Sequence, residues 1–261
     1  MQPEPVTPTA PRPVRRAVFR QAWRDLTFVH WAVDPALVAP LLPDGVRPDV
    51  LAGSTPVGLV AFRMRDIAIG PGPAVPYLGS FPETNVRVYT VDAGGRRGVF
   101  FLSLDATRLV PVLVARALGV PYAWSRMGVV AAGDTRTYTC RRRWPGPRGA
   151  TSRLVVRVGA PVTGPTELER FVTARWGLHL AGRSWLSRGS GPATAYWPNE
   201  HPEWPLHRAD LLDLDDGLVA ATGLPAPVDP PTSVLWSPGV RVRFGPKRPV
   251  LSPGSGPRAG R

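Results

Sequence analysis

Four polar side chains alternate with apolar or β-branched ones in the stretch "GSFPETNVRVYT". They are Glu83, Asn85, Arg87 and Tyr89. A strand sends successive side chains to opposite faces, so an acid, an amide, a guanidinium and a phenol share one face. Such a face either lines a pocket or is the solvent-exposed side of an amphipathic strand.

The next stretch, "GVFFLSLDA", repeats the pattern with Ser103 and Asp105. If the polar faces of the two strands coincide, Asn85 stands opposite Ser103 or Asp105, and the numbers of opposed residues sum to even values. Arg87 would then form at least a structural ion pair, because buried charges must be paired. We favour a ligand pocket over that alternative, with these residues as its polar lining: Glu83, Asn85, Arg87, Tyr89, Ser103 and Asp105.

Two further residues are candidates for chemistry. Arg116 is the only polar residue in "LVPVLVARALGV". Its guanidinium either complements a helix C-terminus or anchors a carboxylate beside Tyr122, and the sequence does not separate these alternatives. His30, in "FVHWAV", is either a satisfied core histidine or an acid–base group, and the first is the more common case.

The elements that must position these residues are mostly short strands. Alternation and turn formers predict strands over 26–33, 56–69, 84–91, 99–105, 124–131, 135–144, 153–158, 193–197, 234–236 and 240–244. Helices are predicted over 34–42, over 107–118, and from Thr166, where Glu169 completes a capping box. The fold class is therefore mainly β with inserted helices, an antiparallel barrel or sandwich.

Both ends of the chain are rich in proline and lack apolar periodicity. We expect residues 1–16 and 245–261 to be disordered and dispensable tails on one domain over 17–244. No window reaches the roughly 18 apolar residues of a membrane span, and no signal peptide precedes the domain, so we expect a cytoplasmic protein that does not enter a membrane.

The net charge of +13 suggests nucleic acid, but 31 of the 32 basic residues are arginines that occur mostly singly along predicted strands. We therefore expect no nucleic-acid partner. Cys140 is the only cysteine, and His201 and His207 form the only metal-like pair, so neither a metal nor a cofactor is expected. Neither a phosphate-binding loop nor a nucleophile elbow is present. The oligomeric state is open.

Several blocks in order resemble one family. They include "DLTFVHWAVDPALVAPLLPDGVRPDVLAG", "FPETNVRVYT", "ARALGVPY", "LERFVTARWGLH" and "HPEWPLHRADL". Over roughly residues 23–244 the chain resembles the YqjF-like family of uncharacterised conserved proteins, in the acetoacetate decarboxylase-like superfamily. The resemblance implies a closed antiparallel β-barrel that encloses a small-molecule cavity.

The superfamily's decarboxylases use a lysine in a Gly-x-Pro-Lys turn to form a Schiff base with a keto acid. The matching stretch here is similar to Gly119-Val120-Pro121-Tyr122, with tyrosine in place of lysine. Lys247, the sole lysine, lies in the C-terminal tail and is a poor substitute. Glu83, in "FPE", resembles the decarboxylases' cavity glutamate.

These observations favour a barrel protein that binds a small anionic or oxo-acid-like ligand without Schiff-base chemistry. One alternative is a lysine-independent lyase or hydratase, with Glu83 or His30 as acid–base group and Tyr122 as proton donor. Another is a structural barrel whose surface binds a partner.

Overall fold

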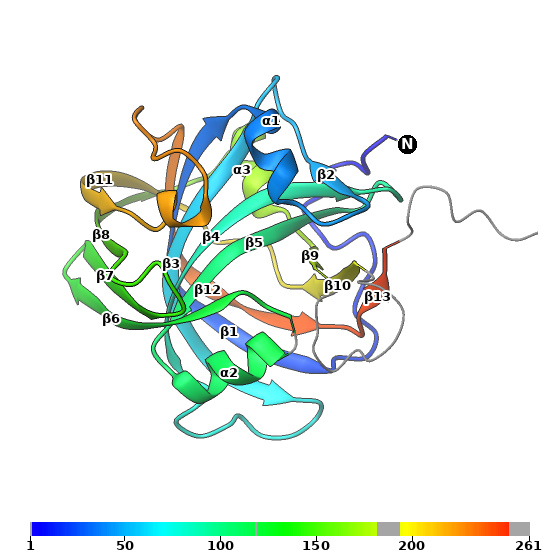
Figure 1. The fold of residues 1–261 in the computed structure, drawn as a ribbon, viewed down its shortest axis with the longest axis horizontal. Helices are drawn as coiled ribbons and strands as arrows, with labels where there is room; N and C mark the ends of the chain where they lie inside the picture. Colours follow the sequence, from blue (N-terminus) through cyan, green and yellow to red (C-terminus); the bar gives the residue numbers. More distant parts are fainter. Residues whose placement is uncertain (1, 118, 182–193, 251–261) are drawn as a thin grey trace, which may run out of the picture.

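The computed structural model describes residues 2–117, 119–181 and 194–250, and its strands form one sheet (Figure 1). The strands are β1 (Phe19–Val33), β2 (Val46–Pro48), β3 (Thr55–Ile69), β4 (Phe81–Asp92), β5 (Arg97–Ala106), β6 (Tyr122–Ala132), β7 (Thr135–Trp144), β8 (Thr151–Pro161), β9 (Gly177–Leu180), β10 (Ala195–Glu200), β11 (His207–Asp216), β12 (Ser233–Phe244) and β13 (Arg248–Pro249). The helices are α1 (Pro35–Val38), η1 (Ala39–Leu41), α2 (Leu109–Ala117), α3 (Glu167–Thr173) and η2 (Ala220–Thr222).

The predicted helix starts are confirmed in atomic detail. Asp34 caps α1 by accepting from the backbone N–H of Ala36 at 2.8 Å. Thr166 and Glu169 form the capping box of α3, with Glu169 Oε2 accepting from Thr166 N at 2.7 Å. The helix predicted over 107–118 is observed as α2, and position 118 lies outside the described residues.

Four strands were missed: the short strands β2, β9 and β13, and the longer strand β11. β11 carries several acids, and they are matched by arginines of its neighbour β8, as in the 2.8 Å pair of Arg153 with Asp213. β9 is only four residues long. Conversely, the two strands predicted over 234–236 and 240–244 are one strand, β12. Gly239 keeps β12 continuous, because a Cβ there would lie 1.9 Å from Trp23 O.

The pairings return to β12 by two routes. One circuit runs β12–β1–β3–β4–β5–β9–β10–β12, and the other continues from β5 through β6, β7, β8 and β11 back to β12. Figure 1 shows β6, β7, β8 and β11 on one side of the shared strands and β9, β10 and β13 on the other. The expectation of purely antiparallel pairing is wrong at β5, which pairs in parallel with both β6 and β9.

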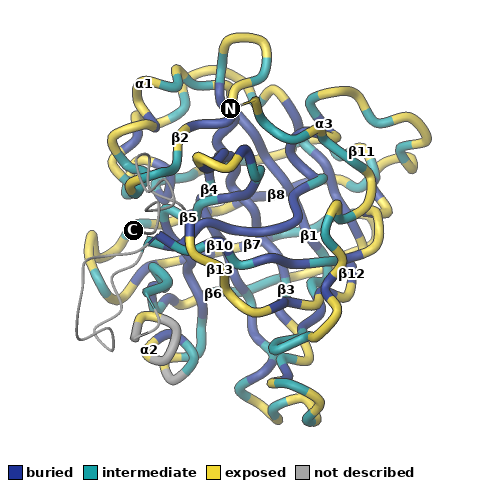
Figure 2. The backbone as a smooth tube through the Cα atoms, turned by 90° about the vertical axis from the view of Figure 1, so that its right-hand side faces the viewer, coloured by how far each residue is buried: buried dark blue, intermediate teal, exposed yellow. Residues whose placement is uncertain are grey.

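The shared strands β1, β3 and β4 are therefore buried on both faces, as Figure 2 shows by the dark blue of their central parts. One face packs in a first core, a cluster of buried side chains that includes Phe28, Val60, Tyr89, Phe171 and Trp204. The other face packs in a second core, which includes Val29, Leu59, Val88, Tyr138 and Leu154. Alternate side chains of these three strands thus pack in two different cores, and neither face is exposed to solvent.

The predicted register of β4 against β5 is wrong over half of its length. Asn85 stands opposite Leu104, and Thr84 stands opposite Asp105, so the numbers sum to an odd value there. Beyond a β-bulge the sum becomes even, with Arg87 opposite Phe101. Leu102 is the extra residue of the bulge, and it turns the following side chains of β5 to the other face.

The N-terminal segment lies against the domain. Glu4 N donates to Gly95 O at 2.9 Å, Trp176 Nε1 donates to Thr7 O at 3.1 Å, and Val14 is buried. Disorder of residues 1–16 stays a prediction, but these contacts favour a bound segment over a detached tail. At the other end, the described residues 245–250 contribute β13, and the remainder of the predicted tail lies outside the described residues.

Within the described ranges, no helix has the length and hydrophobicity that crossing a bilayer would require.

Candidate functional site

Glu83 is the centre of a polar cluster in the first core. Its side chain is buried, Tyr122 Oη donates to its Oε2 at 2.7 Å, and Asn85 Nδ2 donates to its Oε1 at 3.4 Å. Burial disfavours the carboxylate and raises the pKa of Glu83 to about 7, although the two hydrogen bonds oppose that rise. Burial and the neighbouring Glu83 raise the pKa of Tyr122 well above its ordinary value. At neutral pH Glu83 can therefore both accept and donate a proton.

Arg87 lies on the same face of β4, two positions beyond Asn85. Its guanidinium carbon is 5.4 Å from the ring centre of Phe28 and 5.6 Å from that of Tyr89. Within the described parts of the chain, no acid lies within ion-pair distance of Arg87, and its Nε is buried without a hydrogen-bond partner. A partly buried guanidinium without a counter-ion is uncommon in proteins, because burying an unpaired charge is costly.

His30 reaches this cluster because β3 has a glycine between them. Gly58 stands opposite both His30 and Arg87, and a Cβ on Gly58 would lie 3.0 Å from His30 Nε2. Tyr89 Oη donates to Val172 O at 3.1 Å, so His30 Nε2 donates to Tyr89 Oη at 2.7 Å. Burial, and then the charge of Arg87, hold the pKa of His30 well below its ordinary value. The ring is thus neutral, with a bare lone pair on Nδ1.

Three buried polar atoms of this cluster lack a hydrogen-bond partner within the described structure: Asn85 Oδ1, Arg87 Nε and His30 Nδ1. Such orphans are rare in folded proteins, where most buried polar atoms are hydrogen-bonded to the chain or to water. One is a charged donor and two are acceptors, and Glu83 beside them can act in either role. We call Glu83, Asn85, Arg87, His30 and Tyr122 the polar row. Chemically, the polar row can bind an anion and move a proton next to it.

Ser103 and Asp105 do not join the polar row, because the bulge at Leu102 turns them into the second core. There Asp105 accepts from Arg142 Nη2 at 2.6 Å and from Arg142 Nε at 2.8 Å, and Ser125 Oγ donates to it at 2.6 Å. The predicted convergence with Glu83 is therefore wrong for these two residues.

Arg116 also lies outside the polar row. It is exposed, donates to the backbone carbonyl of Tyr122 at 2.8 Å, and places its guanidinium 5.1 Å from the ring of Trp144. Tyr89 is in the first core, but its hydroxyl is occupied by His30 and Val172. Tyr89 therefore holds the ring of His30 in place through their hydrogen bond.

Two buried ion networks were missed. Asp49 contacts both Arg97 and Arg175, with Arg175 Nη1 at 2.6 Å from Asp49 Oδ2. Burial lowers the pKa of Arg175, whose guanidinium lies 4.1 Å from the ring centre of Phe171. Nothing in the isolated sequence "RPDV" signals this, because the partner arginines are far away in the chain.

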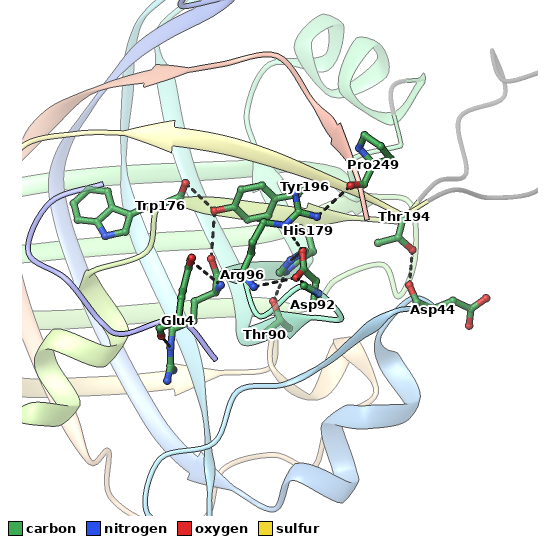
Figure 3. A network of polar contacts seen from close by, with 12 residues as sticks. Glu4, Asp44, Thr90, Asp92, Arg96, Trp176, His179, Thr194, Tyr196 and Pro249 are labelled. Atoms are coloured by element: carbon green, nitrogen blue, oxygen red, sulfur yellow. Dashed lines mark hydrogen bonds and ion pairs between the residues drawn. The ribbon is translucent and has the colours of Figure 1, made fainter. Parts of the chain in front are cut away.

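The second network surrounds His179 (Figure 3). His179 Nδ1 lies 2.8 Å from Thr90 Oγ1, and its Nε2 lies 3.6 Å from Asp92 Oδ2. Arg96 Nε donates to the same carboxylate at 2.6 Å. Burial lowers the pKa of His179. Burial disfavours the carboxylate of Asp92, but hydrogen bonds from His179 and Arg96 outweigh it and lower the pKa of Asp92 to about 2.

Two hollows are lined by other residues. One, of about 740 Å³, lies between Arg20, Arg241 and the loop around Gly72. The other, of about 240 Å³, lies where β9 and β6 diverge from β5, and Phe101 is part of its lining. His201, one half of the predicted metal-like pair, packs 4.6 Å from the ring of Trp176 instead. Among the described residues, no cluster of three or more potential metal ligands is found.

Comparison with known proteins identifies relatives over nearly the whole chain. A family model described as an uncharacterized conserved protein, DUF2071, matches residues 20–241. The uncharacterized protein YqjF of Bacillus subtilis is 28% identical over 217 residues, which are 82% of this chain and 85% of YqjF.

Solved structures of similar fold are acetoacetate decarboxylase-like enzymes. Acetoacetate decarboxylase from Legionella pneumophila superposes with a TM-score of 0.62 at 15% identity, covering 93% of this chain and 92% of that one. The enduracididine biosynthesis enzyme MppR, in complex with pyruvate, gives a TM-score of 0.60 at 15% identity, covering 90% of each chain. The family expected from the sequence blocks and the superfamily fold are both confirmed. This chain belongs to the DUF2071 family of uncharacterized conserved proteins.

Proposed function

We propose that this protein binds a small oxo acid in the first core, with the ligand carboxylate paired to Arg87 and its oxo group facing Glu83 and Tyr122. The observation that carries the proposal is the guanidinium of Arg87, which is partly buried and lacks a counter-ion among the described residues. A carboxylate would complete that ion pair with the bidentate geometry that guanidinium groups favour. We take the circuit of strands around the first core to be a closed barrel that encloses the ligand.

One neighbour in fold has a ligand of this class. MppR, a neighbour in fold, has been solved in complex with pyruvate, which is a small oxo acid. At 15% identity that likeness extends to the fold alone, and the features of this chain that suit an oxo acid are Arg87 and the polar row.

We further propose that binding proceeds without a Schiff base. By the resemblance of Gly119-Val120-Pro121-Tyr122 to the decarboxylase turn, Tyr122 stands in place of the lysine, and a phenol cannot form an imine. Lys247 is exposed and lies 5.1 Å from the ring centre of Trp197. Desolvation lowers the pKa of Lys247 from its ordinary value. None of its described contacts, however, is to the polar row.

A thermal-shift experiment with pyruvate and acetoacetate tests the binding proposal. Both acids should stabilise the protein, by about 2.7 kcal/mol when present at 100 times the dissociation constant. Arg87→Met should abolish that stabilisation. Arg116→Met, which removes an exposed arginine, is the matched control and should retain it. Equal stabilisation of Arg87→Met and the wild type would contradict the proposal, and an absence of any shift would favour the reading as a structural barrel.

Borohydride reduction tests the absence of an imine. Incubation with pyruvate and borohydride should leave the intact mass unchanged, because borohydride traps an adduct only where an amine has condensed with the oxo group. An adduct that maps to Lys247 would overturn this part of the proposal.

A second candidate function is acid–base catalysis on the same ligand, as in a lyase or hydratase. The pKa of about 7 for Glu83 favours it, because a general base works best when its pKa lies near the working pH. The activity would begin with removal of a proton from the carbon next to the oxo group. Exchange of the pyruvate methyl protons in D₂O, followed by NMR, should then be accelerated by the wild type and not by Glu83→Gln.

A further inference from the structure

Two of the unpartnered atoms in the polar row are hydrogen-bond acceptors. They are Asn85 Oδ1 and His30 Nδ1, and the residues that carry them are 3% and 0% exposed. Pyruvate and acetoacetate, once ionised, have only acceptor oxygens and cannot pair with either atom. Because a buried acceptor without a donor is costly, a ligand that brings an O–H or N–H group to this site gains affinity.

The acceptor role of His30 is fixed by the atoms at the other side of its ring. Tyr89 Oη donates its only proton to Val172 O at 3.1 Å, so this oxygen accepts from His30 Nε2, which lies 2.7 Å away. The proton of the neutral ring is therefore on Nε2, and Nδ1 presents a lone pair. Burial, and then the charge of Arg87, lower the pKa of the ring, so Nδ1 stays bare at neutral pH.

His30 lies next to Arg87 because the residue between them has no side chain. Gly58 of β3 stands opposite both His30 of β1 and Arg87 of β4, so the three positions form one row across the sheet. A Cβ on Gly58 would lie 3.0 Å from His30 Nε2 and 3.4 Å from Arg87 Cγ, so both side chains approach the same point above Gly58. Asn85 is the preceding residue on this face of β4. A carboxylate paired with Arg87 therefore lies beside the ring of His30 and the amide of Asn85.

We propose that the ligand is a hydroxylated oxo acid, whose hydroxyl group donates to His30 Nδ1. This inference rests on the proposed function, because it assigns a substrate class to the same site. His30 is then a specificity-determining residue, and Asn85 Oδ1 is the acceptor for a second hydroxyl group of a longer acid. A site with a buried acceptor discriminates strongly against a ligand that lacks the matching donor, because that ligand leaves the acceptor unpaired.

Calorimetric titration with two acids of nearly equal size tests the inference. 3-Hydroxypyruvate has an O–H group where 2-oxobutanoate has a methyl group, and the two are otherwise identical. 3-Hydroxypyruvate should bind at least about tenfold more tightly, which corresponds to about 1.4 kcal/mol, although 2-oxobutanoate is the more hydrophobic acid. Equal affinities, or a preference for 2-oxobutanoate, would overturn the inference and show that water satisfies the two acceptors.

Two variants locate the acceptor. His30→Phe keeps a flat ring without a lone pair and should bind the two acids with equal affinity, whereas His30→Gln, whose carbonyl is again an acceptor, should restore part of the preference. Asn85→Leu is the matched control, because it removes the other buried acceptor, and it should keep the preference. Loss of the preference in Asn85→Leu and not in His30→Phe would overturn the assignment to His30.

Nitrogen NMR of the His30 ring keeps the test decisive if His30→Phe does not fold. In the free protein, Nδ1 should have the resonance of a bare ring nitrogen. It should move toward that of a hydrogen-bonded nitrogen when 3-hydroxypyruvate binds, and should not move with 2-oxobutanoate. The same response to both acids would contradict a hydrogen bond from the hydroxyl group.

The titrations separate this inference from the proposed function. If both acids bind in an Arg87-dependent way with equal affinity, the preference for a hydroxyl group is wrong and the proposed function stands. If neither acid binds, or if Arg87→Met binds both as well as the wild type, both proposals are wrong.

Discussion

The two cores differ in whether their arginine has a carboxylate partner. In the second core, Arg142 forms two hydrogen bonds with Asp105, at 2.6 and 2.8 Å, and the carboxylate also accepts from Ser125. In the first core, Arg87 has aromatic rings beside it and no acid partner among the described residues. A complete ion pair is typical of scaffold, whereas an incomplete one leaves a charge that a ligand can satisfy.

One bulge is responsible for the difference. Asp105 is three residues beyond Leu102, and without the extra residue the alternation would place it on the face of Arg87. The bulge delivers Asp105 to Arg142 and keeps its carboxylate off the face of β4 that carries Glu83 and Arg87. The candidate site is therefore created by a change of register as much as by the residues that line it.

The largest expected effect is on stability in the second core. Arg142→Met should lower the free energy of unfolding by about 3–5 kcal/mol, because it leaves the carboxylate of Asp105 buried and unpaired. Arg87→Met should change it by less than about 1 kcal/mol, since no carboxylate among the described residues loses a partner. Urea unfolding of both variants measures the contrast. Comparable losses would show that Arg87 is scaffold as well.

A control distinguishes loss of pairing from loss of packing at Arg142. The double variant Asp105→Asn with Arg142→Met removes both charges and should recover a large part of the stability that the single variant loses. If the double variant is less stable than Arg142→Met alone, the comparison of the two cores rests on packing and not on charge.

The next effect is on the pH dependence of stability. The folded pKa of Glu83, about 7, is raised from an ordinary value of 4.5, so between these values the folded protein binds the proton more strongly than the unfolded chain. This contribution is present below pH 4.5, is lost as pH rises through 7, and amounts to at most about 3 kcal/mol. Glu83→Gln should flatten the stability profile between pH 5 and 8. An unchanged profile would contradict the assignment.

The smallest expected effect is that of Tyr122→Phe. Removal of its hydroxyl should cost about 1 kcal/mol, as for a typical hydrogen bond. Because that hydrogen bond opposes the rise in the pKa of Glu83, the stability step should also move to higher pH. Urea unfolding from pH 5 to 9 measures both effects. A step that moves to lower pH would show that Tyr122 does not stabilise the carboxylate.

The sequence predicts elements well where one local signal decides them. The caps at Asp34 and Thr166 follow from side chains that satisfy the N–H groups of their own helices, and both are observed. The alternation of Glu83, Asn85 and Arg87 correctly places these three on one face of β4. The residues that face the same core from distant strands, His30 and Tyr122, were named as candidates.

What could not be predicted depends on non-local pairing. Nothing in "GVFFLSLDA" marks Leu102 as a bulge, because any of several apolar residues there could be the extra one. The assignment of Asp105 to the wrong core follows from that single uncertainty. The buried pairs of Asp49 with Arg97 and Arg175 likewise join positions that only the finished fold brings together.

The position of strand β12 near the C-terminus affects when the chain can fold during synthesis. It pairs with β1, β10 and β11, and so completes both circuits from a position near the C-terminus. During synthesis, neither interior can be completed until almost the whole chain has left the ribosome, and its long-range pairings make folding slow. A fragment that ends at residue 232 should therefore aggregate or be held by chaperones. A cooperative unfolding transition for that fragment would show that one interior forms without β12.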